Sequence, residues 1–102
     1  MFYVYLLRSK MKNQLYIGST KDLKRRVEEH NDGKEFSTKR FLPWELIYYE
    51  AFLEEKMARD REKKLKYHGN AIRELKKRLD LSSTIHLSKS TVYNNKGYGI
   101  KK

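Results

Sequence analysis

The chain has 102 residues, which is enough for one domain with a modest hydrophobic core. It carries 24 Lys and Arg against 13 Asp and Glu, and this formal net charge of +11 favours a polyanionic partner, most simply a nucleic acid. Because cysteine is absent, a disulfide framework, a thiolate metal site and a cysteine nucleophile are excluded, and a reducing, cytoplasmic location is expected.

The first residues predict a β-hairpin. FYVYLL is rich in β-branched and aromatic residues, as buried strands are, and is too short for a signal peptide or a membrane span. A polar connector at residues 10–14 leads to LYIG, which resumes the apolar pattern. No strongly apolar face opposes the basic residues, so we expect no membrane partner.

A helix is predicted from the end of this hairpin to about residue 31. Thr20 is the expected N-cap, and Gly33 is the expected stop. Viewed down the helix axis, His30 lies about 20° from Leu23 and Arg26 about 60° from it, so both flank the apolar stripe. Two interpretations remain open: they lie at the edge of the core, or they face a ligand.

The rest of the chain predicts one strand and two helices. WELIYYEAF follows a basic loop at residues 33–43 and reads as a strand, and helices are expected at residues 54–68 and 70–79, separated by Gly69. Residues at a seven-residue step mark one packed face of these helices: Ala58, Leu65, Ile72 and Leu79.

The order β-β-α-β-α-α predicts an α+β fold in which helices flank a small three-stranded antiparallel sheet. This domain should cover residues 1–80. Residues 81–102 change in composition toward Ser, Thr, Asn and Gly, and predict a polar, basic tail that is partly disordered or forms a weak strand.

Glu62 falls on the same helical stripe as Ala58 and Leu65. A carboxylate against a core is costly unless it is paired or binds a metal. Glu62 therefore forms an ion pair, with Arg26 or another base, or it binds a divalent cation such as Mg²⁺ through oxygen.

Tyr5 and Tyr16 stand out among eight tyrosines because both belong to the hairpin that precedes Arg26. Most strand tyrosines are core aromatics whose hydroxyls reach the surface. If these two phenols converge near Arg26 and Glu62, the set suits phosphodiester hydrolysis: a metal and an arginine stabilise charge, and a phenol orients or deprotonates water.

The segments YVYLL, LYIGSTKDLKRRVEEH and PWELIYYEAFLEEKMARDREKKLK together resemble the GIY-YIG nuclease superfamily over residues 2–79. The closest likeness is to small single-domain bacterial proteins similar to the catalytic module of the nucleotide-excision-repair incision subunit. By this resemblance, residues are expected at the catalytic, structural and metal-binding positions: Tyr5, Tyr16, Arg26 and His30 as catalytic, Gly18 as the glycine that permits a tight turn into the helix, and Glu62 as the ligand of one Mg²⁺ or Mn²⁺ ion.

The sequence departs from the family pattern in two places. The first motif reads Tyr3-Val4-Tyr5 and lacks its glycine, and Ser19 stands where some relatives carry a lysine. Asn70 is the candidate for a polar residue late in the fold that assists the site.

The resemblance implies a metal-dependent endonuclease acting on DNA, with RNA not excluded, in repair or recombination. Cutting would be structure-directed or weakly sequence-specific. Basic side chains are expected to contact phosphates: Lys21, Lys24, Arg25, Lys34, Lys39 and Arg40. The alternatives are a nucleic-acid-binding module that does not cut, or that cuts only beside a protein partner, and a basic structural or ribosome-associated protein.

Overall fold

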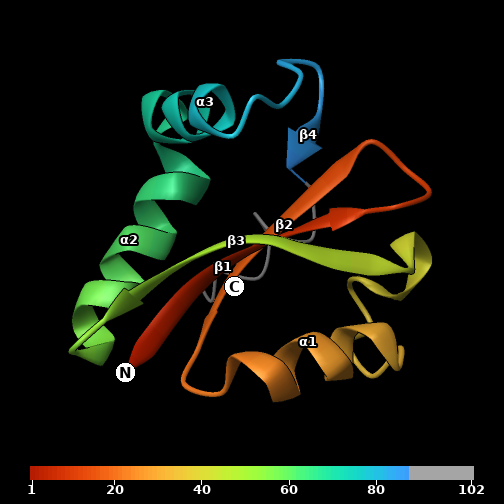
Figure 1. Ribbon diagram of the computed structural model, residues 1–102, viewed down its shortest axis with the longest axis horizontal. Coiled ribbons are helices and arrows are strands. Elements are labelled where there is room, and N and C mark those ends of the chain that lie inside the picture. Colours follow the sequence, from red (N-terminus) through yellow and green to blue (C-terminus); the bar gives the residue numbers. More distant parts are fainter. Residues whose placement is uncertain (88–102) are drawn as a thin grey trace.

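A mixed four-stranded sheet with strand order β3-β1-β2-β4 forms the centre of the fold (Figure 1). The structure, a computed structural model, describes residues 1–87. The elements in chain order are β1 Phe2–Ser9, β2 Gln14–Thr20, α1 Leu23–Asn31, the short 3₁₀ helix η1 Lys39–Phe41, β3 Trp44–Phe52, α2 Glu55–Tyr67, α3 Gly69–Arg78 and β4 His86–Leu87.

The predicted α+β class and element order are confirmed, but the three-stranded antiparallel sheet is wrong. β1 pairs antiparallel with both β2 and β3 as expected, and β4 then adds a fourth strand parallel to β2, with His86 opposite Gln14. The sequence does not reveal β4 because a two-residue strand has no alternating pattern. Its position is fixed by tertiary contacts, including the bond from Asn13 Nδ2 to the Thr84 carbonyl at 3.1 Å.

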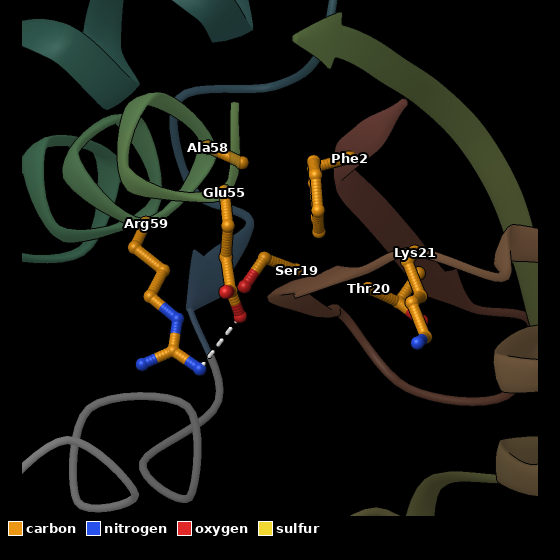
Figure 2. Close-up of a pocket in the computed structure, with 7 residues that line it drawn as sticks. All are labelled: Phe2, Ser19, Thr20, Lys21, Glu55, Ala58 and Arg59. Carbon is orange, nitrogen blue, oxygen red and sulfur yellow. Dashed lines mark hydrogen bonds and ion pairs between the residues drawn. The ribbon is translucent and has the colours of Figure 1, made fainter. Parts of the chain in front are cut away.

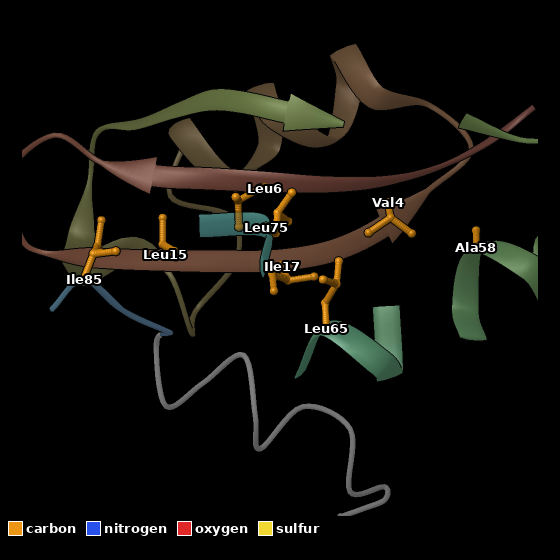
Figure 3. Close-up of a cluster of buried hydrophobic side chains, with 8 residues drawn as sticks. All are labelled: Val4, Leu6, Leu15, Ile17, Ala58, Leu65, Leu75 and Ile85. Atoms are coloured by element: carbon orange, nitrogen blue, oxygen red, sulfur yellow. The ribbon is translucent and has the colours of Figure 1, made fainter. Parts of the chain in front are cut away.

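Hydrophobic side chains cover both faces of the sheet, which is why β1 reads as a continuous apolar run. Val4 and Leu6 face α2 and α3 and join the larger core cluster, which Figure 3 shows together with Leu65 and Ile85. Tyr5 and Leu7 point to the opposite face, which α1 covers. Successive residues of a strand point to opposite faces, so Tyr5 lies on the α1 side of the sheet.

The predicted helix boundaries are correct to within a few residues, but the predicted N-cap is wrong. Asp22, and not Thr20, caps α1 by accepting a bond from the Arg25 backbone N–H at 3.1 Å. Thr20 is the last residue of β2. Gly33 follows the helix with φ of +73°, a conformation that favours glycine.

Ile85 extends the core beyond the predicted domain end at residue 80, since it is buried in the cluster with Leu15 and Leu75. The predicted weak strand in the tail corresponds to β4, and residues 88–102 of that tail lie outside the described residues. Within residues 1–87, every helix is too short or too polar to cross a bilayer.

Replacing Ile85 with Ala should lower the free energy of unfolding by about 2–5 kcal/mol, because the change leaves a cavity in the core. Leu53→Ala is the matched control: Leu53 is 77% exposed, so its removal should change stability by less than about 0.5 kcal/mol. Urea denaturation followed by circular dichroism measures both. Equal stability of the two variants would show that Ile85 is not part of the core.

Candidate active site

Eight residues line a cleft of about 330 Å³ between the edge of β2 and the helices α1 and α2. They come from β1, β2, α1, α2 and the loop after α1, and comprise Tyr5, Tyr16, Gly18, Ser19, Arg26, Glu35, Glu62 and Lys66. The two phenols, the guanidinium and the carboxylate predicted for one site from the sequence all line this cleft.

The cleft lies beside the later part of β2, between α1 and α2. β4 pairs only with Gln14 and Leu15, at the start of β2. Among the described residues, the outer edge of β2 beyond Leu15 therefore carries no partner strand, and α1 and α2 lie on either side of it (Figure 1). Side chains from both faces of the sheet can meet around such an edge.

Gly18 makes space for the Tyr5 ring. It lies inside β2 directly opposite Tyr5, and a Cβ atom there would sit 2.5 Å from the Tyr5 hydroxyl oxygen and 3.1 Å from Cε2 of Tyr16. The prediction that Gly18 permits a tight turn is wrong, because the strand continues to Thr20. Glycine is required here by close packing of a phenol.

A buried chain of hydrogen bonds holds Tyr5. Its hydroxyl lies 3.0 Å from Nε2 of His30, and Nδ1 of His30 lies 2.9 Å from Oγ1 of Thr38. Thr38 in turn donates to the Glu35 carbonyl at 3.3 Å. With the Thr38 proton used there, His30 carries its proton on Nδ1, and Nε2 accepts the Tyr5 hydroxyl proton.

His30 is fully buried and lies behind the cleft wall. Of the two interpretations of His30, the structure agrees with the one that places it at the core. From there it contacts Tyr5, which lines the cleft. Burial, followed by the charge of Arg26, lowers the pKa of His30 to about 4, so its ring is neutral at physiological pH.

Tyr5 is a neutral phenol in this environment. Burial raises its pKa above the ordinary value, and the neighbouring Tyr16 raises it further. The Arg26 guanidinium opposes this effect, but the pKa remains raised. A deprotonated Tyr5 would therefore require added positive charge in the cleft.

Arg26 is fixed by two carboxylates, at 3.1 Å from Glu29 and 2.8 Å from Glu35. Burial would lower the pKa of Arg26, but the hydrogen bonds to Glu35, Tyr5 and Glu29 leave it raised, so the guanidinium is always charged. Glu35 lines the cleft and was missed by the sequence analysis. The available signal was its place as the one acidic residue in the basic loop at residues 33–43.

Both carboxylate oxygens of Glu62 have a partner. The Ser19 hydroxyl donates to Oε1 at 2.6 Å, and the Lys66 ammonium lies 2.5 Å from Oε2. Lys66 is one helical turn from Glu62, and its side chain is only 2% exposed. The ion pair expected for Glu62 is thus formed with Lys66, while Arg26 pairs with other carboxylates.

The donor set suits one Mg²⁺ or Mn²⁺ ion held by a single carboxylate. No group of three or more His, Asp or Glu able to hold a metal occurs within the described part of the chain. Mg²⁺ is commonly held by one or two carboxylates, with waters and substrate phosphates completing its shell. Both cleft carboxylates are ion-paired, Glu35 with Arg26 and Glu62 with Lys66, and Glu62 is the one that the family resemblance puts in that role.

The predicted phosphate-binding residues are all exposed: Lys21, Lys24, Arg25, Lys34, Lys39 and Arg40. They follow β2, lie on α1 or lie in the segment after α1, and none of them lines the cleft itself. Asn70 does not line the cleft; it is exposed on α3, where its side chain accepts a bond from Arg73. The polar residue from the later part of the fold that does line the cleft is Lys66.

A second pocket adjoins the cleft and shares Ser19 with it (Figure 2). Phe2 and Ala58 form its apolar part, and its rim carries Lys21 and the Glu55–Arg59 ion pair at 2.9 Å. This combination of an aromatic ring, an apolar surface and cations lies next to the Glu62 site.

In the described part of the chain, the mixed sheet, the three α-helices and the cleft at the edge of β2 define an α+β domain with a polar candidate site. The GIY-YIG catalytic domain model matches residues 1–78, and the chain belongs to this nuclease family. The resemblance seen in the sequence is confirmed.

Similar proteins include the UPF0213 proteins of Streptococcus pyogenes serotype M5 (strain Manfredo), serotype M2 (strain MGAS10270) and serotype M28 (strain MGAS6180). Each is 47% identical over 51 residues, which cover 49% of this chain and 54% of the relative. The match therefore spans about half the length of these relatives. No solved structure matches the chain significantly.

Gly18→Ala should destabilise the protein by about 1–3 kcal/mol, because the added methyl group overlaps the Tyr5 hydroxyl. Gly69→Ala is the matched control, since a Cβ at Gly69 meets nothing within 4 Å. Urea denaturation of both variants checks this. If Gly18→Ala is as stable as wild type, the ring does not pack on the backbone as described.

Acid should destabilise the protein through His30. Since its pKa is lowered from 6.5 to about 4 on folding, the unfolded chain binds more protons between these values, and stability falls as pH falls through that range. Between pH 7 and pH 5, wild type should lose about 2 kcal/mol more than a His30→Gln variant, whose side chain does not titrate. Denaturation curves at both pH values test this, and parallel losses in the two proteins would contradict a neutral, buried His30.

Proposed function

We propose that the chain is an endonuclease that hydrolyses DNA phosphodiester bonds with the help of one Mg²⁺ or Mn²⁺ ion. The observation that carries this proposal is the convergence of Tyr5, Tyr16, Arg26 and Glu62 on one cleft. In a cytoplasmic repair or recombination setting, such a small domain would recognise DNA structure or a weakly defined sequence.

Glu62 would hold the metal ion, and Ser19 would fix the orientation of the carboxylate through Oε1. The bound ion supplies neutralisation of the scissile phosphate and of the leaving oxygen. Arg26 would stabilise the negative charge that develops in the transition state, since its guanidinium is charged and locked by Glu29 and Glu35.

Tyr5 would orient the attacking water through its hydroxyl oxygen. Nε2 of His30 accepts the hydrogen bond of the Tyr5 hydroxyl and would so fix the oxygen to which the water donates. His30 then acts on the reaction through Tyr5. Tyr16 packs on the His30 ring at a centroid distance of 4.8 Å and keeps this pair in place.

DNA would lie across the surface beside α1, where Lys21, Lys24 and Arg25 are exposed, and the loop bases would add contacts. The pocket beside Ser19 would receive the nucleotide next to the scissile phosphate, with its base against Phe2. A base can enter such a pocket only when it is unstacked, which favours branched or single-stranded sites over intact duplex.

The second candidate function is a nucleic-acid-binding module that does not cut, or that cuts only beside a protein partner. One observation favours it: both oxygens of Glu62 are already engaged, by Ser19 and Lys66. RNA is an alternative substrate for either function.

Glu62→Gln and Arg26→Ala should each lower the cleavage rate of branched DNA at least 100-fold and leave DNA affinity within about threefold, because each removes transition-state charge stabilisation and not the exposed basic surface. Asp60→Asn and Arg73→Ala are matched controls on exposed positions of α2 and α3. A gel assay with Mg²⁺ or Mn²⁺ measures cleavage, and fluorescence anisotropy measures binding.

If wild type and both site variants nick equally, the activity is contamination and the enzyme proposal fails. If wild type binds DNA but cuts no branched, nicked or single-stranded DNA or RNA substrate with either metal, the non-cutting module is the correct function.

DNA affinity should fall with salt at a log–log slope of about 0.9 per phosphate contacted. The Lys24→Ala/Arg25→Ala double variant should lower that slope by about 1–2, since two phosphate contacts are lost. Lys77→Ala, on an exposed part of α3, should leave the slope unchanged. An unchanged slope in the double variant would show that DNA does not lie along α1.

A further inference from the structure

Lys66 occupies a position that the proposed mechanism does not use. Its ammonium group lines the cleft and contacts Glu62, the carboxylate expected to hold the metal ion, at 2.5 Å. On the same helix, Lys63 and Lys64 are exposed, so Lys66 is the lysine of this run whose charge is directed inward.

A divalent ion and the Lys66 ammonium compete for the same carboxylate. A metal ion ligated by Glu62 would lie within a few ångströms of the ammonium, where two positive groups repel strongly in a part-buried site. Ser19 is not displaced in the same way, because a neutral hydroxyl can stay bonded to one oxygen while the other binds a cation.

We propose that Lys66 couples metal binding to DNA binding. In the free protein, the Lys66 ammonium neutralises Glu62 and keeps its affinity for divalent cations low. When a DNA phosphate enters the cleft, the ammonium shifts to the phosphate, and Glu62 is released to bind the metal ion. Lysine suits this exchange, because it is a point charge on a flexible stem and is a common phosphate ligand.

This inference rests on the proposed function. It also offers another explanation for the engagement of both Glu62 oxygens, the observation that favours a non-cutting module. The engaged carboxylate is then the resting state of an enzyme that acquires its metal ion with its substrate. A purely structural Lys66 would stabilise α2 against β2, and its loss would lower stability without raising metal affinity.

Mn²⁺ binding measured by electron paramagnetic resonance of the free ion tests the proposal directly. Without DNA, Lys66→Met should bind Mn²⁺ at least tenfold more tightly than wild type, since the competing charge is gone. Lys66→Arg, which keeps the charge, should stay within threefold of wild type, as should Lys63→Met, which removes an exposed charge from the same helix.

A branched DNA with phosphorothioate linkages should raise the Mn²⁺ affinity of wild type at least tenfold and that of Lys66→Met less than twofold. The same measurement on the complex of Glu62→Gln with this DNA gives the amount of Mn²⁺ that the DNA binds by itself, and this background is subtracted. By linkage, Mn²⁺ should raise the DNA affinity of wild type by the same factor. If Lys66→Met fails to fold, Lys66→Gln, which also removes the charge, takes its place, because a DNA phosphate that ligates the ion would raise the wild-type affinity without any role for Lys66.

Equal or weaker Mn²⁺ binding by folded Lys66→Met, or no effect of DNA on Mn²⁺ affinity in wild type, would overturn the inference. Mn²⁺ binding that depends on Glu62 and ignores both Lys66 and DNA would overturn this inference and leave the proposed function standing. Absence of any Glu62-dependent Mn²⁺ binding, with or without DNA, would overturn both.

Discussion

The contact of Glu62 with Ser19 and Lys66 is the interaction on which the account of this protein depends. It joins α2 to β2 at 2.6 Å through Ser19, and it places a part-buried carboxylate in the same cleft as Arg26. A charge in this position is unfavourable unless it is compensated, and the Lys66 ammonium compensates it. The feature that looks like a defect on a core-facing helical stripe is therefore what gives the cleft its chemistry.

The opposite wall of the cleft depends on packing. The Tyr5 ring reaches its place because Gly18 has no side chain, and its hydroxyl is then fixed by His30 and Thr38. The cleft therefore combines charged groups, Arg26 among them, with neutral hydrogen-bonded groups. The raised pKa of Tyr5 and the lowered pKa of His30 follow from the same burial.

Much of the fold could be predicted from local patterns. The apolar run of β1, the hairpin and the seven-residue step in α2 and α3 are each encoded by neighbouring residues. A weak strand in the tail was predicted, but its parallel pairing with β2 was not, because that pairing depends on Gln14 and on the burial of Ile85, which are contacts distant in sequence. The N-cap of α1 was predicted at Thr20 instead of Asp22, because threonine and aspartate are both good N-caps. The length of β2, which includes Thr20, decides between them.

The residues of the candidate site show the same difference between what sequence motifs predict and what tertiary contacts determine. Tyr5, Tyr16, Arg26 and Glu62 could be named because family motifs mark them. Glu35 lies outside those motifs, and Lys66, although it ends the helix motif quoted for Glu62, was given no role until the cleft was seen. Asn70 was misplaced because it belongs to α3, no residue of which lines the cleft. Partners of charged groups are set in three dimensions, and a chain with 24 basic residues offers too many choices for sequence reasoning.

Anomalous diffraction from crystals of the protein grown with Mn²⁺ and a branched DNA oligonucleotide is the most direct test of the central claim. The account predicts an Mn²⁺ peak at about 2.2 Å from a Glu62 oxygen, with Arg26 and Tyr5 facing the same phosphate and the Lys66 ammonium no longer on Oε2. A metal ion bound elsewhere, or DNA bound on a face away from these side chains, would contradict it.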